Sequence, residues 1–366
     1  MKQCNIIGLM SGSSLDGIDL VAVNFKYDQN DIEATLKFEI IAADCISFGS
    51  NWIHQLQNAK KLSVPDFLEL HTLFGRYLGS TINDYIIANH LQKKNINAIA
   101  SHGHTIYHNP TKNTSFQLGE GAQIAAITGI RTIADLRNMD VALGGQGAPI
   151  VPISERQLFH QYAFCLNIGG IANITINTQK AIAFDICPAN QVLNYFAQKL
   201  GKLFDDKGAY AKSGIINTNI LDLLLSNAYL HNKAPKSLDN SFSIENVIPI
   251  LDALTPQDAL CTAVEYIALS IKNALVLNNA TSAFNSKSQL LITGGGAFNS
   301  YLIERIQYWL KSYNVTVVIP AHNIIAYKEA LAMALIGLYR LEEKPNVLAS
   351  VTGAQYDNIG GSLWLP

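Results

Sequence analysis

Hydrophobic and polar residues follow one another along the chain in patterns that predict strands and helices in turn. An apolar run at residues 4–10 predicts a strand, and a second strand is expected at residues 18–25, after a turn of small residues. Apolar side chains recur at helical spacing from residue 67 to residue 86, behind Ser63 as N-cap. They predict a long amphipathic helix that ends near residue 93 and covers a sheet.

The second half of the chain repeats the opening. Residues 165–168 predict a strand, Gly169 and Gly170 a turn, and residues 171–176 a returning strand that a further strand follows at 181–185. We therefore expect the same strand-turn-strand unit twice, each with covering helices. Further helices are expected at 121–128, 190–200, 256–277, 297–313 and 328–342, and further strands at 96–100, 131–136, 289–293 and 315–319.

Composition and charge favour a globular α/β protein of two domains. A length of 366 residues corresponds to about two domains. Hydrophobic residues make up 49% of the chain and charged residues 15%, which is typical of a core-rich protein and not of a disordered one. The 26 basic and 28 acidic residues are scattered. We therefore expect no nucleic-acid partner and no anionic membrane surface as partner.

Cysteine usage and the start of the chain favour a cytoplasmic location. The five cysteines form an odd set without a Cys-x-x-Cys spacing, so neither a disulfide framework nor a zinc ribbon is indicated. Asp16 interrupts the apolar start before a signal peptide could form. The longest window without charge, residues 157–179, contains glycine, asparagine and histidine and is too polar to insert into a bilayer.

Three glycine-containing turns stand at the ends of expected strands: 11–14, 169–170 and 294–296. Glycine lets the backbone approach a ligand closely and aim successive N–H groups at an anion. One such turn would be explained by chain reversal alone, but three at corresponding strand ends favour a nucleotide site. The P-loop pattern is absent, and the first turn leads into a strand, so the dinucleotide-binding fingerprint also fails.

Three carboxylates lie beside these turns: Asp16, Asp19 and Asp185. A carboxylate at a strand end can hold magnesium through water or accept a proton from a nucleophile. A turn residue that bonds its own backbone is a competing interpretation of Asp16. Asp185 follows a strand that we expect to be fully buried, where a carboxylate without a partner or a task is costly. A catalytic role is therefore favoured for Asp185.

Three histidines, at positions 102, 104 and 108, permit a metal-hydrolase interpretation. No carboxylate or cysteine completes a common ligand set nearby, so a contact to a sugar hydroxyl or a core position is favoured instead. Arg137 and Asp140 precede the glycine-rich loop 144–149 and fit an acidic sugar substituent and a structural salt bridge equally well. Glu329 opens a helix, where a carboxylate is favourable against the helix dipole.

With these motifs assembled, the chain resembles the anhydro-N-acetylmuramic acid kinase family, within the superfamily of actin, Hsp70 and sugar kinases. The match runs nearly end to end. A set of motifs this large, in this order, is specific to the family and not only to the superfamily. The matching segments are Ile7–Asp19, Ser101–Gly103 with Thr105 and His108, Asp135–Asp140, Gly144–Pro149, Leu166–Asn173, Gly294–Gly296 with Asn299, Glu329–Leu331 and Ser350–Ala354.

The resemblance implies an α/β fold of duplicated actin-like, ribonuclease H-like domains with a nucleotide cleft between them. The domains would comprise residues 1–130 with 343–366, and residues 131–342. The resemblance further implies a cytoplasmic, homodimeric enzyme that uses ATP, Mg²⁺ and water to open 1,6-anhydro-N-acetylmuramic acid. The same reaction phosphorylates this small amino sugar to N-acetylmuramic acid 6-phosphate for cell-wall recycling.

The resemblance also implies roles for individual residues. Asp185 would be the catalytic base, and Asp16 would hold magnesium through water. The sugar would meet His102, Gly103, Arg137 and Glu329. The nucleotide would meet Gly12, Ser13, Ser14, Leu15, Asp16, Gly17, Ile18, Asp19, Gly169, Gly170, Gly294, Gly295, Gly296 and Asn299.

Some positions depart from the family pattern. Residues 184–190 read Phe-Asp-Ile-Cys-Pro-Ala-Asn, where the family usually has Phe-Asp-Thr-Gly-Pro-Gly-Asn, and Asn194 replaces a common aspartate. His104 stands where glutamine is usual, and residues 236–239 lack the usual Thr-Gly-Arg after Lys-Ser. These departures favour an alternative, a catalytically impaired nucleotide or sugar sensor of the same fold. The retained Asp185 favours the kinase.

Overall fold

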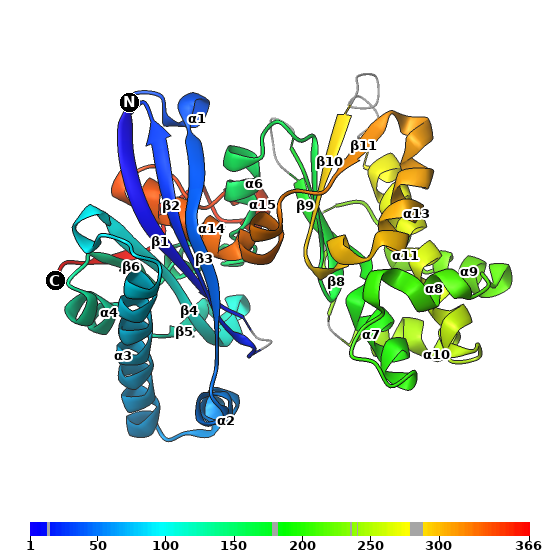
Figure 1. Cartoon of the computed structure of the whole chain (residues 1–366), viewed down its shortest axis with the longest axis horizontal. Coiled ribbons are helices and arrows are strands. Elements are labelled where there is room, and N and C mark those ends of the chain that lie inside the picture. Colours follow the sequence, from blue (N-terminus) through cyan, green and yellow to red (C-terminus); the bar gives the residue numbers. More distant parts are fainter. Residues whose placement is uncertain (13–14, 178–181, 235, 240, 279–287) are drawn as a thin grey trace. The chain divides into compact units, whose positions relative to one another are not determined.

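The computed structural model of the chain describes residues 1–12, 15–177, 182–234, 236–239, 241–278 and 288–366. Contacts between residues divide the chain into two compact units. Unit 1 comprises residues 1–158 and 327–366, and unit 2 comprises residues 159–326 (Figure 1). The chain therefore crosses from one unit to the other twice, and unit 2 is an insertion within unit 1.

Unit 1 is built on a seven-stranded sheet in the order β12-β6-β4-β1-β2-β3, with β5 paired to β4. The first three strands form an antiparallel meander, whereas β4 runs parallel to β1 and β6 runs parallel to β4. The strands are β1 (Lys2–Ser11), β2 (Gly17–Tyr27), β3 (Lys37–Ser47), β4 (Ala98–Asn109), β5 (Thr114–Leu118), β6 (Thr132–Ala134) and β12 (Ser362–Trp364).

Helices cover both faces of this sheet. Ile7 and Leu9 of β1 point into a core shared with α3 (Val64–Ala88), while Gly8 between them faces α14 (His322–Leu341). A Cβ atom on Gly8 would lie 2.0 Å from the Ala330 carbonyl oxygen, so glycine permits this close packing. The other helices of unit 1 are α1 (Ile32–Thr35), α2 (Ser50–Asn58), α4 (Gly121–Thr128), α5 (Asn138–Ala142), α6 (Pro152–Leu158) and α15 (Ala349–Thr352).

Local signals in the sequence explain where α3 begins and ends. The Ser63 side chain accepts a hydrogen bond from the Asp66 amide, which confirms the expected N-cap. The helix ends at Ala88 and not near residue 93 as expected, because His90 adopts a left-handed conformation with φ of 53° and turns the chain.

Unit 2 contains a five-stranded sheet in the order β11-β10-β7-β8-β9. Strands β7, β8 and β9 form an antiparallel meander, and β10 and β11 continue the sheet in parallel with β7. In Figure 1, the green strands β8 and β9 and the later strands β10 and β11 belong to this one sheet, although they lie far apart in the chain. The strands are β7 (Phe164–Ile168), β8 (Ile171–Ile176), β9 (Ile182–Pro188), β10 (Ser288–Thr293) and β11 (Val315–Val318).

The two sheets have the same topology. Strands β3-β2-β1-β4-β6 correspond in order and direction to strands β9-β8-β7-β10-β11. The expected repetition of a strand-turn-strand unit is therefore confirmed, as is the α/β fold of two duplicated ribonuclease H-like domains.

Helix α11 (Pro256–Leu277) forms the centre of the core of unit 2. Its N-cap, Thr255, accepts a hydrogen bond from the Asp258 amide, as expected. It is the one helix among the described residues with the length and apolar composition of a membrane span. Of the apolar 18-residue stretch that gives it this composition, 72% is buried within the protein. The other helices of unit 2 are α7 (Asn190–Lys199), α8 (Ala209–Ser213), α9 (Thr218–Leu225), α10 (Ile248–Leu251) and α13 (Ser300–Leu310).

The units divide the chain differently from the expected domains. Residues 131–158 and 327–342 lie in unit 1, although the sequence suggested that they belong to the second domain. Pairing explains the difference, because β6 extends the sheet of unit 1 and α14 packs on β1 through Gly8.

Candidate active site

The first glycine turn of unit 1 joins the end of β1 to the start of β2. The Leu15 amide donates to the Gly12 carbonyl (3.3 Å), and Asp16 Oδ1 accepts from the Gly17 amide (3.0 Å). The Asp16 carboxylate thus bonds its own turn, which agrees with the structural interpretation of this residue. The expected nucleotide contacts Ser13 and Ser14 lie outside the described residues.

Two other residues of this turn have clear packing roles. A Cβ atom on Gly17 would lie 2.5 Å from the Ile46 carbonyl oxygen, so glycine is required by the approach of β3. The Ile18 side chain is fully buried in the core beneath α3. Neither residue therefore has a side chain available to a ligand, so any contact with nucleotide would involve the backbone alone.

A group of carboxylates gathers beside this turn. Asp19 lies on β2 opposite Cys45 of β3. Burial raises the pKa of Asp19, a hydrogen bond with Cys45 opposes that shift, and the nearby carboxylates Asp16 and Glu329 add to it. Within the described parts of the chain, no three His, Cys, Asp or Glu side chains form a group that could hold a metal ion directly. The arrangement suits a hydrated divalent cation, whose charge would relieve the repulsion between carboxylates.

A buried histidine orients an arginine on the same sheet edge. Arg137 Nε donates to His102 Nε2 (2.8 Å), and Arg137 Nη1 donates to the Gly147 carbonyl (2.6 Å). An arginine only donates, so the His102 proton lies on Nδ1, which donates to the Gly103 carbonyl (3.1 Å). Burial, aided by Arg137, lowers the pKa of His102 to about 3. Both nitrogens of neutral His102 are engaged, so this residue positions Arg137.

The Arg137 guanidinium retains one donor group for a ligand. No hydrogen bond from Nη2 to the described residues accompanies those from Nε and Nη1. Burial lowers the pKa of Arg137 to about 10, and the carboxylate of Glu329 opposes this shift. Glu329 is exposed on α14, so unit 1 brings an arginine and a carboxylate together.

Gly103 and Asp140 fix the backbone around Arg137. Gly103 has φ of 69°, and a Cβ atom there would lie 2.3 Å from the Leu118 carbonyl oxygen. The fully buried Asp140 carboxylate accepts hydrogen bonds from the Gly147 amide (2.7 Å), Thr352 (2.8 Å) and Asn358 (2.9 Å). No ion pair joins Asp140 to Arg137 among the described residues, so Asp140 fixes the loop and does not form the salt bridge considered above.

The three histidines are separately engaged. His104 Nδ1 bonds Ser11 Oγ (2.9 Å), and His108 Nδ1 bonds Ser115 Oγ (3.0 Å), whereas His102 bonds Arg137. In the part of the chain that the structure describes, these side chains belong to no group of three potential metal ligands. The geometry therefore gives no support to the metal-hydrolase interpretation.

Asp185 of unit 2 is held on β9 by a neighbouring segment. Its Oδ2 atom accepts from the Leu238 amide (2.9 Å), and its own amide donates to the Lys236 carbonyl (3.2 Å). Tyr229 donates its hydroxyl to the Asp185 carbonyl (2.8 Å). The side chain is half-buried and not fully buried as expected. Burial raises the pKa of Asp185, and the Leu238 amide opposes that shift.

Polar side chains cross the sheet of unit 2 in register with Asp185. Asn173 on β8 lies opposite Asp185, and Asn167 on β7 lies opposite Asn173. All three are half-buried, so they form one line across three strands. Sequence reasoning singled out Asp185 alone, although the alternation within each strand was the signal for this shared line.

The second and third glycine turns meet at the end of β7. A Cβ atom on Gly294 would lie 2.7 Å from Asn167 Oδ1, and one on Gly296 would lie 2.2 Å from Ile168 Cγ2. Gly295 has open space apart from Asn190 Nδ2 at 3.4 Å. Gly294 and Gly296 thus permit close packing, while the space beside Gly295 is open.

A pocket of about 300 Å³ opens beside Gly295. Of the residues expected to bind nucleotide, Gly295 and Asn299 line it. Sequence reasoning assigned no role to the other lining residues, although two asparagines four positions apart on α7 were an available signal. These other residues include Asn190, Asn194, Phe204 and Phe298.

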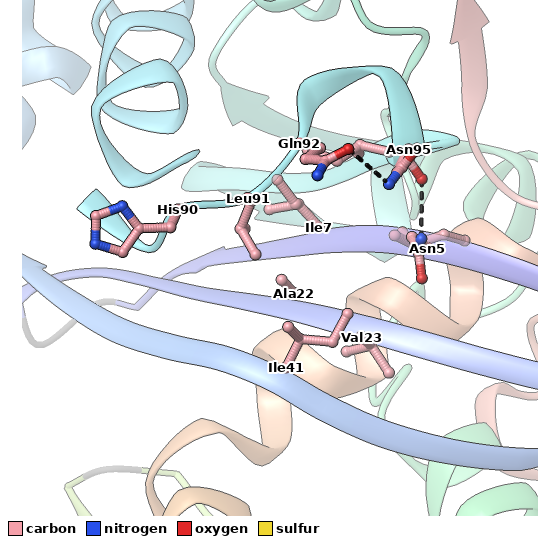
Figure 2. Close-up of a pocket in the computed structure, with 11 residues that line it drawn as sticks. Asn5, Ile7, Ala22, Val23, Ile41, His90, Leu91, Gln92 and Asn95 are labelled. Carbon is pink, nitrogen blue, oxygen red and sulfur yellow. Dashed lines mark hydrogen bonds between the residues drawn. The ribbon is translucent and has the colours of Figure 1, made fainter. Parts of the chain in front are cut away.

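Unit 1 also contains a pocket of about 220 Å³, which is separate from these turns (Figure 2). Asn5 Nδ2 donates to the Asn95 carbonyl (2.9 Å), and Asn95 Nδ2 donates to Gln92 Oε1 (3.4 Å). The amides therefore bond one another. Asn5 precedes Ser11 by six positions on β1, or about 20 Å, so this pocket lies outside the candidate site.

Comparisons with known proteins agree with the geometry. The model of the family described as anhydro-N-acetylmuramic acid kinase matches residues 4–366. The protein of that name from Shewanella halifaxensis is 34% identical, with 99% of both chains covered. The one from Pasteurella multocida is 35% identical over 97% of this chain and 96% of the relative.

Solved structures give more distant likenesses. The activator of 2-hydroxyisocaproyl-CoA dehydratase from Clostridium difficile has a TM-score of 0.44 at 13% identity, covering 93% of this chain and 96% of that one. Component A of (R)-2-hydroxyglutaryl-CoA dehydratase from Acidaminococcus fermentans has a TM-score of 0.47 at 12% identity, covering 93% and 100%. Because the family model spans nearly the whole chain and curated relatives match it end to end, the chain belongs to the anhydro-N-acetylmuramic acid kinase family.

Proposed function

We propose that the protein uses ATP and water to convert 1,6-anhydro-N-acetylmuramic acid to N-acetylmuramic acid 6-phosphate and ADP. The observation that carries this proposal is the family match over residues 4–366, a range that includes Asp185. The reaction would serve cell-wall recycling in the cytoplasm, with a homodimer as the working form.

The bond changes balance with one base. Asp185 accepts a proton from water, and the water oxygen forms a bond to the anomeric carbon. The bond from that carbon to O6 breaks, and O6 takes the γ-phosphoryl group of ATP while ADP leaves. The proton held by Asp185 then returns to solvent.

The surroundings of Asp185 support its role as base. Burial raises the pKa of Asp185 towards the neutral pH range. A general base is most effective when its pKa lies near the working pH. The Leu238 amide fixes Oδ2, and Oδ1 has no hydrogen-bond partner among the described residues. One oxygen therefore orients the group, and the other is available to water.

Unit 1 supplies groups that suit the sugar and the metal. The remaining Arg137 donor and the nearby Glu329 would bind the carboxylate and a hydroxyl of the amino sugar. Asp16 and Asp19 would hold Mg²⁺ through water, and the ion would supply charge neutralisation at the phosphates. Gly295 in unit 2 would present backbone to the nucleotide.

The test is ADP release with and without anhydro-N-acetylmuramic acid, with mass spectrometry of the sugar. We expect sugar-dependent release and a product heavier by one phosphoryl group (HPO3) and one water. A protein that binds both substrates but yields no phosphorylated sugar after long incubation would instead be the sensor. The hydrogen bond from the Leu238 amide orients the Asp185 carboxylate, which favours the kinase. None of the comparisons favours the sensor.

A further inference from the structure

Three residues from a neighbouring segment of unit 2 bond Asp185 at three different groups. The Tyr229 hydroxyl donates to the Asp185 carbonyl (2.8 Å), and the Asp185 amide donates to the Lys236 carbonyl (3.2 Å). The Leu238 amide donates to Asp185 Oδ2 (2.9 Å). The amide, the carbonyl and the carboxylate of Asp185 are thus all held from one side, which fixes both its position and its direction.

The Lys236 side chain joins these bonds to one another. Its ammonium group donates to the Tyr229 carbonyl (3.0 Å) and lies 4.4 Å from the centre of the Tyr229 ring. It also lies 5.8 Å from the centre of the Phe184 ring. A cation is attracted to the face of an aromatic ring, and more strongly where water is partly excluded. Tyr229 and Lys236 are both half-buried, so Lys236, Tyr229 and Asp185 form a closed ring of contacts.

This ring of contacts is supported by the core of unit 2. The Phe242 ring lies 5.5 Å from the Tyr229 ring, centroid to centroid. The Ala234 amide donates to Oδ1 of Asn278 (3.1 Å), which is the C-cap residue of α11. The segment that holds Asp185 is therefore itself attached to the central helix of the unit.

The titratable groups around Asp185 and Tyr229 are few. Burial raises the pKa of Cys187 to about 12 and raises the pKa of Tyr229 and Tyr266, so these three groups are neutral near pH 7. Lys236 is the cation among them, and its ammonium contacts a ring and a carbonyl group. The backbone amide that bonds the Asp185 carboxylate lowers the pKa of Asp185 against the effect of burial. Loss of that bond should therefore raise the pKa of Asp185.

We propose that Tyr229 and Lys236 are positioning residues, which hold the Asp185 backbone so that its carboxylate stands where it accepts the proton from water. The inference rests on the proposed function, in which Asp185 is the base. It adds that the rate of the reaction depends on two side chains that act through the backbone of Asp185 and not through a bond to its carboxylate.

The first test needs no substrate. Tyr229→Phe removes one hydroxyl group and keeps the ring beneath Lys236. Hydrogen exchange of the full chain, measured by mass spectrometry, should then become about threefold faster or more in peptides that contain the amides of Asp185 and Leu238. Unchanged exchange in both peptides would overturn the proposal.

A matched control is available on α7. The Tyr195 hydroxyl donates to Asp252 (3.3 Å), and the Lys199 ammonium lies 4.8 Å from the centre of the Tyr195 ring. Tyr195→Phe therefore removes the same atom from a similar lysine-tyrosine pair that does not bond Asp185. It should leave exchange at Asp185 and turnover unchanged.

Steady-state kinetics separate positioning from substrate binding. Tyr229→Phe and Lys236→Met should each lower kcat by about 10- to 100-fold, because misplacement of a catalytic group by about 1 Å can cost on the order of 10²-fold. KM for ATP and for the sugar should change by less than about twofold. Lys236→Arg keeps a cation for the ring and should recover most of kcat. It also keeps the test decisive if Lys236→Met does not fold. Unchanged kcat, or a loss confined to KM, would contradict the proposal.

The pH profile of kcat gives a readout that a loss of stability alone would not move. If the Leu238 amide holds the carboxylate less well in Tyr229→Phe, the pKa of Asp185 rises. The acid limb of the profile should then shift to higher pH by about 0.5 to 1 unit. A lower kcat with the acid limb in its original place would assign Tyr229 a structural role only.

A double variant distinguishes this inference from the proposed function. If Tyr229 acts through Asp185, Tyr229→Phe should slow the Asp185→Asn variant by no more than about twofold. Losses that multiply would show that Tyr229 acts independently of Asp185 and would refute the inference. Normal turnover by Asp185→Asn alone would instead contradict the proposed function, while the exchange measurement would still report whether Tyr229 holds the segment.

Discussion

The two sheets share one strand order but carry different chemistry at the equivalent turn. In unit 1, the turn between β1 and β2 is followed by carboxylates, Asp16 and Asp19. In unit 2, the turn between β7 and β8 lies between the amides Asn167 and Asn173, and Asp185 comes one strand later. The backbone provides the same strand ends twice.

This difference teaches that the scaffold sets where a site lies and side chains set what it does. Carboxylates beside the first turn suit a hydrated cation. Glycines and amides at the second turn suit an anionic ligand, which a carboxylate at that place would repel. The following changes break one half of this comparison at a time.

The largest effect is expected at Asp185. Asp185→Asn keeps the shape of the side chain but removes the base, so turnover should fall by about 10²- to 10⁴-fold. Nucleotide affinity, measured by calorimetry, should stay nearly constant. Asp239→Asn on the adjoining exposed segment is the control and should retain activity. Near-normal turnover by Asp185→Asn would show that another group is the base.

A second effect separates the ion pairs of the two units. Lys328 and Glu155 of unit 1 pair at 2.7 Å with side chains 7% and 5% exposed. Lys328→Met removes the cation that pairs with a buried carboxylate and should lower the free energy of unfolding by about 3–5 kcal/mol. Lys212→Met in unit 2 breaks a pair with side chains 62% and 57% exposed. It should cost under about 1 kcal/mol in the same urea titration.

A smaller effect distinguishes packing glycines from binding glycines in unit 2. Gly296→Ala forces a methyl group onto Ile168 and should lower the free energy of unfolding by about 1–3 kcal/mol. Gly295→Ala meets only Asn190 at ordinary contact distance and should melt normally while binding ADP more weakly. Unchanged ADP affinity of Gly295→Ala would assign this glycine to packing as well.

The effect that is smallest at neutral pH is a pH dependence of stability in unit 1. In the unfolded chain, His102 takes up a proton near the ordinary histidine pKa of 6.5, whereas in the folded protein it does so at about 3. Stability from this group is therefore complete above pH 6.5 and falls as the pH drops from there towards 3, by up to about 1.4 kcal/mol per pH unit. His102→Gln should flatten the profile of unfolding free energy, and exposed His231→Gln should not.

Local signals made much of the fold predictable. The paired strand-turn-strand patterns and the caps at Ser63 and Thr255 depend on neighbouring residues, so they could be recognised in the sequence. Strand β3 was not expected, because its exposed and half-buried positions give a weak alternation. The unit boundary also required pairing between distant segments, such as β6 with β4.

The candidate site was only partly predictable for the same reason. That Arg137 donates to His102, or that Leu238 holds Asp185, depends on contacts between segments far apart in the chain. The departures at Ile186, Cys187 and Ala189 looked like changes beside a base. All three are at most 1% exposed and belong to the core of unit 2. They pack the strand and helix behind Asp185, which no motif comparison could indicate.

The insertion of unit 2 within unit 1 has a consequence for synthesis on the ribosome. The strands and helices of unit 2 up to β11 emerge before α14 and β12, which complete the sheet layers of unit 1. The inserted unit can therefore reach its native state first, while β1 waits with the face around Gly8 uncovered. Unit 1 is therefore the first to begin translation and the last to complete its fold. During that interval its exposed apolar sheet is the part of the nascent chain that a chaperone would bind.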